Sequence, residues 1–265
     1  MRVRKLKLAI VCYANSLPLS WGFMQNRPKD RFELEFSPPA LCADKIAAGS
    51  VDIGLIPAIA YQRIPDLRII PNLSVASKGS VRSVLLVSKV PWSRIRSVAL
   101  DRSSRTSVIL LRILLRMRNQ LDPTFYSHEP ELASMLRRHD AALLIGDAAL
   151  TADTASLYRY DLAEAWLEET GKPFVFAFWA CRAESGLEDS SPFEESYRYG
   201  KAHLDDIVRQ QSCQLRIPTE QIRSYLTRCI DYSLDEENLD GLLHFYRLAR
   251  EMNLIAETKP LQFVR

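Results

Sequence analysis

A short turn rich in hydroxyl groups is the part of the sequence best suited to hold an anion. Residues 101–107 read DRSSRTS and lie between a strand-like stretch at 97–100 and a strongly apolar, helical stretch from Val108 onwards. The first amide N–H groups of a helix have no partners inside it, and the helix dipole adds partial positive charge beside them. The side-chain donors in the turn include Ser104, Arg105, Thr106 and Ser107. The turn suits a carboxylate or phosphate, although an ordinary helix cap explains the same residues equally well.

Four other loops follow predicted strands and carry groups that suit ligand binding. If the carboxyl ends of the strands face one cleft, these loops meet there. The candidate residues in them are Asn15, Ser16, Pro57, Ser83, Gly146 and Asp147. Each loop also has a structural explanation: Asn15 is common in turns, Ser16 and Asp147 can cap helices, and the stretch 77–83 is polar enough for a solvated hairpin. Taken together, the five loops hold amides, hydroxyls and arginines but almost no strong base or nucleophile.

Composition excludes several classes of function. The 265 residues suffice for one large or two moderate domains, and 47% hydrophobic with 25% charged residues is typical of a globular protein. The net charge of +3 is spread along the chain, so no nucleic-acid partner is expected. The five cysteines and four histidines lack disulfide-framework or ligand spacing, so no metal site is expected. No phosphate-binding glycine loop or serine nucleophile motif is present, which disfavours nucleotide chemistry and serine hydrolysis.

The amino-terminal segment imitates a signal peptide only faintly. Basic residues within 2–7 precede an apolar run at 8–12, which is too short and is not followed by a small-residue cleavage pattern. No apolar stretch reaches the length of a membrane span. We therefore expect a cytoplasmic protein without a membrane partner.

Alternating strand and helix signals predict an α/β fold of two lobes. Strands are expected at 6–13, 32–37, 52–56, 68–75, 81–88, 97–100, 124–127, 141–145 and 174–178, and helices at 19–24, 39–48, 106–117, 131–139, 193–211, 219–230 and 236–252. Residues 91–175 form the second lobe as an α/β unit of their own. Residues 1–90 and 176–265 rejoin as the first lobe, an amino-terminal sheet covered by carboxyl-terminal helices. Binding sites in such proteins lie in the cleft between the lobes.

Five motifs, taken in order, resemble those of the chorismate dehydratase family, which opens the futalosine route to menaquinone. They are YxNSxP at 13–18, DIGLIP at 52–57, SVRSVLLVS at 80–88, DxSSRTS at 101–107 and IGD at 145–147. The resemblance implies a periplasmic-binding-protein-like fold of type II, which agrees with the two-lobed prediction. It also implies that chorismate loses water to give 3-[(1-carboxyvinyl)oxy]benzoate, with neither a metal nor an organic cofactor.

The resemblance gives the candidate residues their expected roles. Chorismate carries two carboxylates, and the predicted grip on one of them consists of Ser104, Thr106 and Ser107 with their backbone amides. Asn15 and Ser83 are expected to hold the other carboxylate or the departing hydroxyl. Arg105 and Asp147 are expected to pair with each other and brace the cleft.

The base of the reaction is the open part of this prediction. Dehydration removes a proton from one ring carbon while the hydroxyl leaves its neighbour. Asp147 is one candidate, but an aspartate is a weak base unless burial raises its pKa. The other is the substrate's own enolpyruvyl carboxylate, with the protein supplying orientation and hydrogen bonds. Because the loops are short of bases, we favour the substrate carboxylate.

Three alternative functions stay open from the sequence. A non-catalytic solute-binding protein of the same fold is disfavoured because neither a signal peptide nor a lipidation cysteine is recognisable. A later enzyme of the futalosine route, acting on a cyclised futalosine derivative, would need a histidine-bearing loop, and only His128 near a strand end qualifies. A ligand-sensing protein is the third class, and no partner surface is visible for it.

Overall fold

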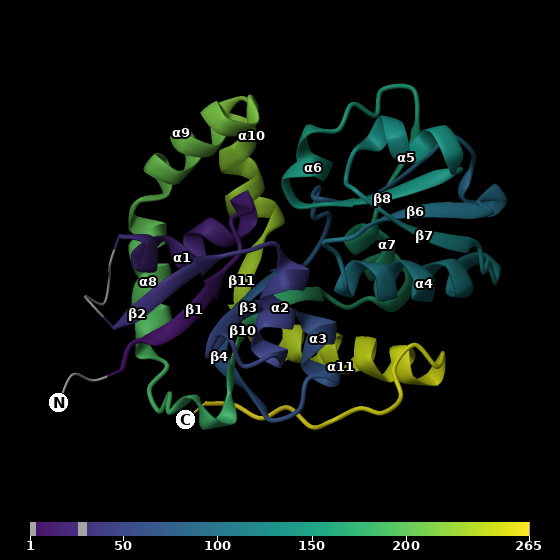
Figure 1. The fold of residues 1–265 in the computed structure, drawn as a ribbon. Coiled ribbons are helices and arrows are strands. Elements are labelled where there is room, and N and C mark those ends of the chain that lie inside the picture. The colour runs from purple at the N-terminus through teal and green to yellow at the C-terminus, as the bar shows by residue number, and fades with distance from the viewer. Residues whose placement is uncertain (1–3, 26–30, 265) are drawn as a thin grey trace.

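Two β-sheets, each in its own lobe, form the frame of the protein (Figure 1). The structure is a computed structural model and describes residues 4–25 and 31–264. The strands of the first lobe are β1 (Leu6–Ile10), β2 (Phe32–Phe36), β3 (Ile53–Pro57), β4 (Leu67–Ser77), β10 (Phe174–Arg182) and β11 (Asp231–Leu234). Those of the second lobe are β5 (Val84–Ser88), β6 (Ser97–Asp101), β7 (Thr124–His128), β8 (Ala141–Ile145) and β9 (Tyr158–Asp161). The α/β class is as predicted.

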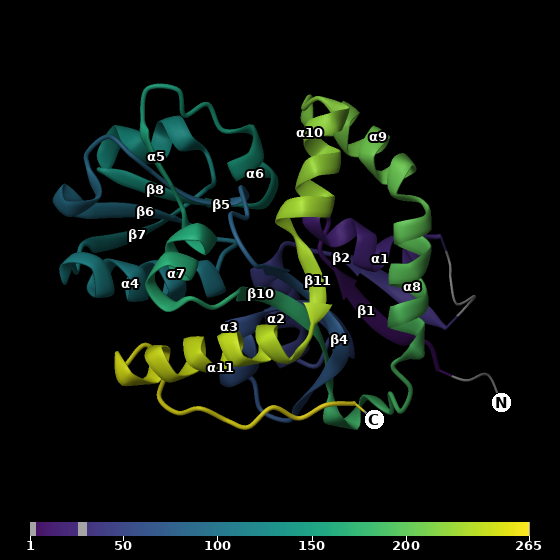
Figure 2. The ribbon, with the colours of Figure 1, turned by 180° about the vertical axis from the view of Figure 1, so that it is seen from behind.

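Helices cover both sheets. The first lobe carries α1 (Leu17–Met24), α2 (Pro39–Ala47), α3 (Ala58–Arg63), α8 (Ser191–Ala202), α9 (Leu204–Leu215), α10 (Thr219–Ser224) and α11 (Glu236–Glu251). The second lobe carries α4 (Thr106–Asn119), α5 (Leu132–Arg138), α6 (Gly146–Thr151) and α7 (Leu162–Thr170). Short turns of helix occur at η1 (Ala14–Ser16) and, in π-helical form, at η4 (Tyr225–Cys229). Seen from behind, α11 runs from β11 beneath the second lobe (Figure 2), where it contacts α4.

The two sheets share one plan. The strand order is β11-β4-β10-β3-β1-β2 in the first and β7-β6-β8-β5-β9 in the second. In each sheet three neighbouring strands are parallel: β2, β1 and β3 in the first lobe, and β7, β6 and β8 in the second. The next strand across the sheet is antiparallel to them, and it is β10 in the first lobe and β5 in the second. Parallel neighbours need helical crossovers, which α1, α2, α4 and α5 supply. The shared plan means that equivalent loops of the two lobes occupy equivalent positions.

The core of the first lobe sits around strands that are buried on both faces. Every residue of β3 is buried, as expected for a strand inside a covered sheet. The rings of Phe23, Trp179 and Phe193 contact one another with centroids 5.1 to 6.0 Å apart. Helices α1 and α8 approach so closely that a Cβ at Gly200 would lie 2.1 Å from the Pro18 carbonyl oxygen. This packing fixes α1, and with it the loop that precedes α1.

The boundary between the lobes lies earlier than the predicted division at residues 90 and 91. β5 pairs with β8 and β9 and therefore belongs to the second sheet. The first crossover is thus the stretch 78–83, which we had also considered as a hairpin, and the second leads from α7 into β10. The apolar sequence of β5 marks it as a buried strand, but it does not reveal which sheet the strand joins.

The first crossover is held by one carboxylate. Asp161, at the end of β9, accepts hydrogen bonds from the Ser80 hydroxyl at 2.8 Å and from the backbone N–H groups of Val81 at 3.2 Å and Arg82 at 2.6 Å. The same carboxylate caps α7 through two further N–H groups. Arg82 has a left-handed backbone with φ of 62°, a conformation that side-chain-bearing residues rarely adopt. These hydrogen bonds keep the strained crossover in one shape.

Several elements differ from the sequence-based prediction. The helix expected at 193–211 is two helices that break at His203, and β11 lies between the helices expected at 219–230 and 236–252. β9, β11 and the helices α3, α6 and α7 were not predicted. β9 and β11 are four residues each, too short for a periodic pattern to stand out. Among the described residues, no helix combines the length and apolar character that crossing a membrane requires.

Candidate functional site

A pocket between the two lobes gathers nearly all of the predicted site residues. The space between its lining atoms is about 570 Å³ with the open solvent at its mouth included, and the centre of a water-sized sphere can occupy about 60 Å³ of it. The predicted residues that line it are Asn15, Ser16, Pro57, Ser83, Ser104, Arg105, Thr106, Ser107 and Gly146. Asp147 is the exception, because it lies next to Gly146 without lining the pocket. The pocket is therefore built from the strand-end loops of both lobes.

The rim of the pocket is formed where helices begin. β1, β3, β6 and β8 each end at the pocket, and α1, α3, α4 and α6 start close behind them. α4 is the longest of these helices, and Ser107 lies in its first turn. Its first amide groups have no intrahelical acceptor and carry the positive end of the helix dipole. This rim attracts an anion, and Arg105 is the lining residue that carries a full positive charge.

Asp101 shapes the turn DRSSRTS. Its carboxylate accepts from the backbone N–H of Ser103 at 2.9 Å, from the Ser103 hydroxyl at 2.6 Å and from the backbone N–H of Ile145 at 3.3 Å. The turn is thereby tied to the end of the neighbouring strand β8. Tyr13 of the first lobe lies 3.1 Å from the Ser103 hydroxyl. Since the Ser103 hydroxyl already donates its hydrogen to Asp101, the Tyr13 hydroxyl is the donor in its contact with Ser103.

The three predicted hydroxyl donors of this turn differ in their surroundings. The Thr106 hydroxyl accepts from the Ile59 backbone N–H of the first lobe at 3.2 Å, so it retains its own hydrogen. The Ser104 side chain is nine-tenths buried, and its oxygen has no hydrogen-bond partner among the described residues. A buried hydroxyl without a partner is costly. Ser104 is therefore the residue of the turn whose hydrogen-bonding capacity is most clearly left for a ligand.

Arg105 does not pair with Asp147 as we expected. Its guanidinium forms an ion pair with Asp44 of α2 at 2.6 Å, which joins the lobes at the pocket's edge. Asp147 instead accepts the Ala14 backbone N–H at 3.0 Å, another contact between lobes. Both residues brace the cleft, but each with a different partner. Asp44 lies on a predicted helix, and nothing in its sequence context indicated that it would face the turn.

Asn15 and Ser83 are linked by a residue that the sequence analysis missed. The hydroxyl of Tyr225, from the π-helical segment η4, donates to the Ser83 oxygen at 2.8 Å and is also hydrogen-bonded to the Asn15 side chain. Because the single Tyr225 hydrogen is used on Ser83, the Asn15 amide is the donor to Tyr225. Burial raises the pKa of Tyr225, and its two hydrogen bonds oppose that rise only in part. Ser83, as an acceptor, keeps its own hydrogen for the pocket.

Ser16, Pro57 and Gly146 serve the shape of the pocket. The Ser16 hydroxyl donates back to the carbonyl oxygens of Val11 and Tyr13, so its side chain does not cap α1 as expected. Pro57 ends β3 and directs the chain into α3. Gly146 has a φ of 59°, and a Cβ there would lie 2.6 Å from the Tyr13 ring. A larger residue at 146 would therefore push Tyr13 into the pocket.

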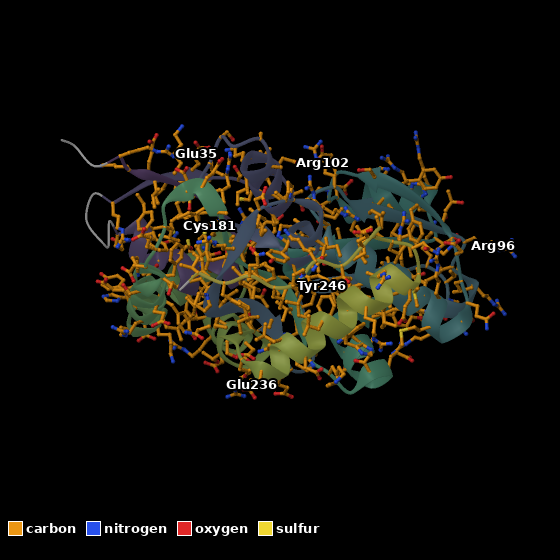
Figure 3. The ribbon with its side chains drawn as sticks, turned by 90° about the horizontal axis from the view of Figure 1, so that it is seen from below. Glu35, Arg96, Arg102, Cys181, Glu236 and Tyr246 are labelled. Carbon is orange, nitrogen blue, oxygen red and sulfur yellow. The ribbon has the colours of Figure 1, made fainter. Side chains whose placement is uncertain are left out.

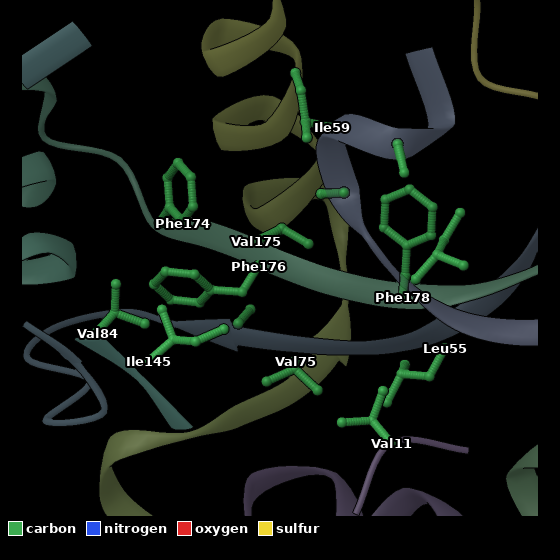
Figure 4. Packing of buried hydrophobic residues seen from close by; sticks show 14 of the residues in the cluster. Val11, Leu55, Ile59, Val75, Val84, Ile145, Phe174, Val175, Phe176 and Phe178 are labelled. Carbon is green, nitrogen blue, oxygen red and sulfur yellow. The ribbon is translucent and has the colours of Figure 1, made fainter. Parts of the chain in front are cut away.

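The floor of the pocket is apolar. Val11, Leu55 and Val75 contribute from the first lobe, and Val84 and Ile145 from the second. Phe176 of β10 completes it, and Figure 4 shows its ring beside Val84 and Ile145. An apolar floor below a donor-rich rim fits a ring that carries carboxylates.

Asp147 is the acid whose environment is most relevant to chemistry. Burial raises its pKa from the usual 3.8 to about 6, while the Ala14 N–H opposes the rise. His128, the residue on which the alternative enzyme depended, does not line the pocket and packs edge-on against the His139 ring. Over residues 4–25 and 31–264, no group of three or more His, Cys, Asp and Glu side chains is arranged to hold a metal ion.

Known proteins match the chain over nearly its whole length. The profile of a menaquinone biosynthesis family covers residues 6–251. The chorismate dehydratase of Thermus thermophilus is 30% identical over 263 residues, which span 92% of this chain and 94% of that protein. The chain belongs to the menaquinone biosynthesis family. The family resemblance drawn from the five motifs is confirmed.

Solved structures agree with the predicted architecture. Protein AF1704 from Archaeoglobus fulgidus has a TM-score of 0.79 at 17% identity and covers 96% of this chain with all of its own length (100%). The periplasmic aliphatic sulphonate binding protein SsuA from Escherichia coli has a TM-score of 0.66 at 16% identity and covers 97% of this chain with 95% of its own. These matches confirm the periplasmic-binding-protein-like fold. The roles of the individual site residues stay predictions.

The hydrogen bond between Tyr225 and Ser83 can be tested through stability. Tyr225→Phe leaves the fully buried Ser83 oxygen without its donor, so we expect a loss of about 1–2 kcal/mol in the free energy of unfolding, measured with urea. Tyr232→Phe is the matched control, because the Tyr232 hydroxyl is buried without a partner in the described part of the chain. That control should change stability by less than about 0.5 kcal/mol or increase it. Equal losses of stability in the two variants would contradict a stabilising role for the hydrogen bond between Tyr225 and Ser83.

The raised pKa of Asp147 predicts a pH dependence of stability. An acid whose pKa is about 6 in the folded protein and 3.8 otherwise holds its proton better when folded, so stability falls as the pH rises from about 4 to about 6. Asp147→Asn removes this cost and keeps an acceptor for Ala14. We expect the variant to gain about 1–3 kcal/mol relative to the parent between pH 4 and pH 7, with no further gain above. Asp122→Asn, at an exposed carboxylate, is the control; a pH-independent difference for Asp147→Asn would contradict the prediction.

Proposed function

We propose that this protein is a chorismate dehydratase, which removes water from chorismate to give 3-[(1-carboxyvinyl)oxy]benzoate. The observation that carries the proposal is the 30% identity with the Thermus thermophilus enzyme over 92% of this chain. The pocket supports it independently, because a donor-rich rim above an apolar floor suits a dicarboxylate with a ring. The proposal includes the futalosine route, which rests on the five sequence motifs, and the cytoplasmic location predicted from the sequence.

Substrate binding uses donors that have no other task. The Ser104 hydroxyl, the Ser107 side chain and the first amides of α4 hold one carboxylate. The Thr106 hydroxyl assists, since it already accepts from Ile59 and can still donate. On the opposite side, the free hydrogen of Ser83 is directed to the second carboxylate or to the departing hydroxyl. Asn15 holds Tyr225, which in turn orients Ser83.

The reaction breaks one C–H bond and one C–O bond on neighbouring ring carbons. The electrons of the C–H bond become the new ring double bond, and the hydroxyl departs as water after it receives a proton. The substrate's enolpyruvyl carboxylate removes the ring proton, and the protein orients the two groups. Asp147 is less suited to this step, because it does not line the pocket and its carboxylate is already held by the Ala14 N–H. Aromatisation supplies the driving force, so positioning suffices.

A second candidate is a carboxylate-binding protein without activity. The likeness to the sulphonate binding protein SsuA favours it, because the two folds overlay with a TM-score of 0.66. In that case the pocket would hold chorismate or a related dicarboxylate unchanged.

Incubation with chorismate tests both candidates. The purified protein should convert chorismate into an aromatic product 18 mass units lighter, roughly the mass of one water, as followed by absorbance and mass spectrometry. A Ser83→Ala variant serves as the comparison, because it removes the donor directed to the substrate. Tight binding of chorismate without any turnover would favour the second candidate, a carboxylate-binding protein, over the dehydratase. Absence of both binding and turnover would overturn the proposal altogether.

Two substitutions separate the candidate bases. Asp147→Asn should retain more than about a tenth of the parent's turnover if the substrate carboxylate is the base, whereas Asn15→Ala should lose about a hundredfold because Tyr225 and Ser83 are no longer ordered. Turnover and substrate binding are measured for both, together with thermal unfolding. A loss of several orders of magnitude in Asp147→Asn with intact binding would make Asp147 the base. An unaltered rate in Asn15→Ala would remove Asn15 from the site.

A further inference from the structure

Three arginines from both lobes surround a second cavity beside the substrate pocket. Arg63 lies at the end of α3 in the first lobe, while Arg105 precedes α4 and Arg112 lies within it in the second lobe. Asn253 and Leu254, which follow α11, close the cavity on the side of the first lobe. The cavity holds about 590 Å³ counted out to its open mouth. It therefore lies on the seam between the lobes.

The positive charge at this seam is only partly neutralised. Arg105 has Asp44 as its partner, and that carboxylate is 56% exposed and screened by solvent. Within the described ranges, neither Arg63 nor Arg112 forms an ion pair with a carboxylate. Arg112 stacks over the Phe125 ring at 4.4 Å, and its Nε atom is buried without an acceptor. Burial, Arg105 and Arg112 all lower the pKa of Arg63, as expected where guanidinium groups repel one another.

We propose that this cavity binds a phosphate group, free or as a phosphomonoester, which bridges the two lobes. A guanidinium presents paired N–H donors that match phosphate oxygens, and the phosphate dianion has enough oxygens to meet Arg63, Arg105 and Arg112 together. A single carboxylate has two oxygens and one charge, which leaves one arginine unmatched. Ser104 lines this cavity as well as the substrate pocket. Phosphate binding thus removes repulsion between the lobes next to the residues that grip the substrate.

The consequence is a link between phosphate and the arrangement of the lobes. Arg63 moves with the first lobe and Arg112 with the second, so their repulsion favours separation of α3 from α4. An anion between them favours the arrangement seen here, in which Arg116 of α4 also donates to the Met252 carbonyl oxygen after α11 at 2.9 Å. This inference does not depend on the proposed reaction, because it concerns a different cavity and a different ligand.

Isothermal titration calorimetry with inorganic phosphate tests the site in the full-length protein. The titration is made in chloride buffer at constant ionic strength, so that general screening does not change. We expect saturable binding to the parent at one site and binding at least about tenfold weaker in Arg63→Ala, because a charge-assisted contact is lost. Most of the Arg63 residue is exposed although its guanidinium is partly desolvated, so we expect its removal to leave the fold intact. Arg112→Ala should weaken binding in the same direction.

Two controls define where the phosphate binds. Arg96→Ala removes an exposed arginine at the far end of the second lobe (Figure 3), and it should leave phosphate binding unchanged. Ser83→Ala alters the substrate pocket alone and should also leave it unchanged. A parallel titration with glycerol 3-phosphate distinguishes the sources: tighter binding than inorganic phosphate supports a phosphomonoester, and weaker binding supports free phosphate.

Three results would overturn the proposal. They are no binding of either compound to the parent at millimolar concentration, equal binding to Arg63→Ala and the parent, or loss of binding in Ser83→Ala with retention in Arg63→Ala. The last result would place the phosphate in the substrate pocket. Failure of the dehydratase assay would leave the phosphate titration unaffected, so the two proposals fail separately.

Discussion

The pocket exists because hydrogen bonds join the two lobes around it. Asp147 accepts from Ala14, Thr106 accepts from Ile59, Tyr13 donates to Ser103, and Arg105 pairs with Asp44. In each pair one partner belongs to the first lobe and the other to the second. Neither lobe alone encloses the space, and every one of these contacts lies beside a residue that lines it. The geometry of the pocket is therefore a property of how the lobes meet.

These contacts also decide which groups are left to act on a ligand. A hydroxyl that accepts from protein retains its hydrogen, as in Thr106 and Ser83, while a hydroxyl whose hydrogen is already used, as in Ser103, is left as an acceptor. The ligand consequently meets donors rather than bases. Asp147 is adjacent in sequence to the lining residue Gly146, and burial favours the neutral form of its carboxyl group up to a pH of about 6. A site of this kind can bind and orient an anionic substrate, which agrees with the proposal that the substrate itself supplies the base.

Motifs at strand ends made most of this pocket predictable from sequence, since nine of the predicted residues line it. A strand followed by a polar turn and a helix is a local pattern, and the α/β rule brings such turns together. Partners distant in sequence carry no such pattern. Tyr225 lies 142 residues from Ser83, in a region where the sequence indicates only helix, and a π-helical turn directs its hydroxyl to Ser83. Asp44 was missed for the same reason. The boundary at β5 was misplaced because an apolar sequence shows that a strand is buried but not which sheet it joins.

The seam between the lobes contains both attractive and repulsive interactions. Hydrogen bonds at Ala14 and Ile59 draw the lobes together, whereas Arg63 faces Arg105 and Arg112 across a cavity on the same seam. Individual hydrogen bonds of this kind contribute about 1 kcal/mol each. Repulsion among the three guanidinium groups acts against these contacts. In the proposed complex, substrate carboxylates at the turn of α4 would add to the attraction between the lobes, whereas an anion among the arginines would reduce the repulsion.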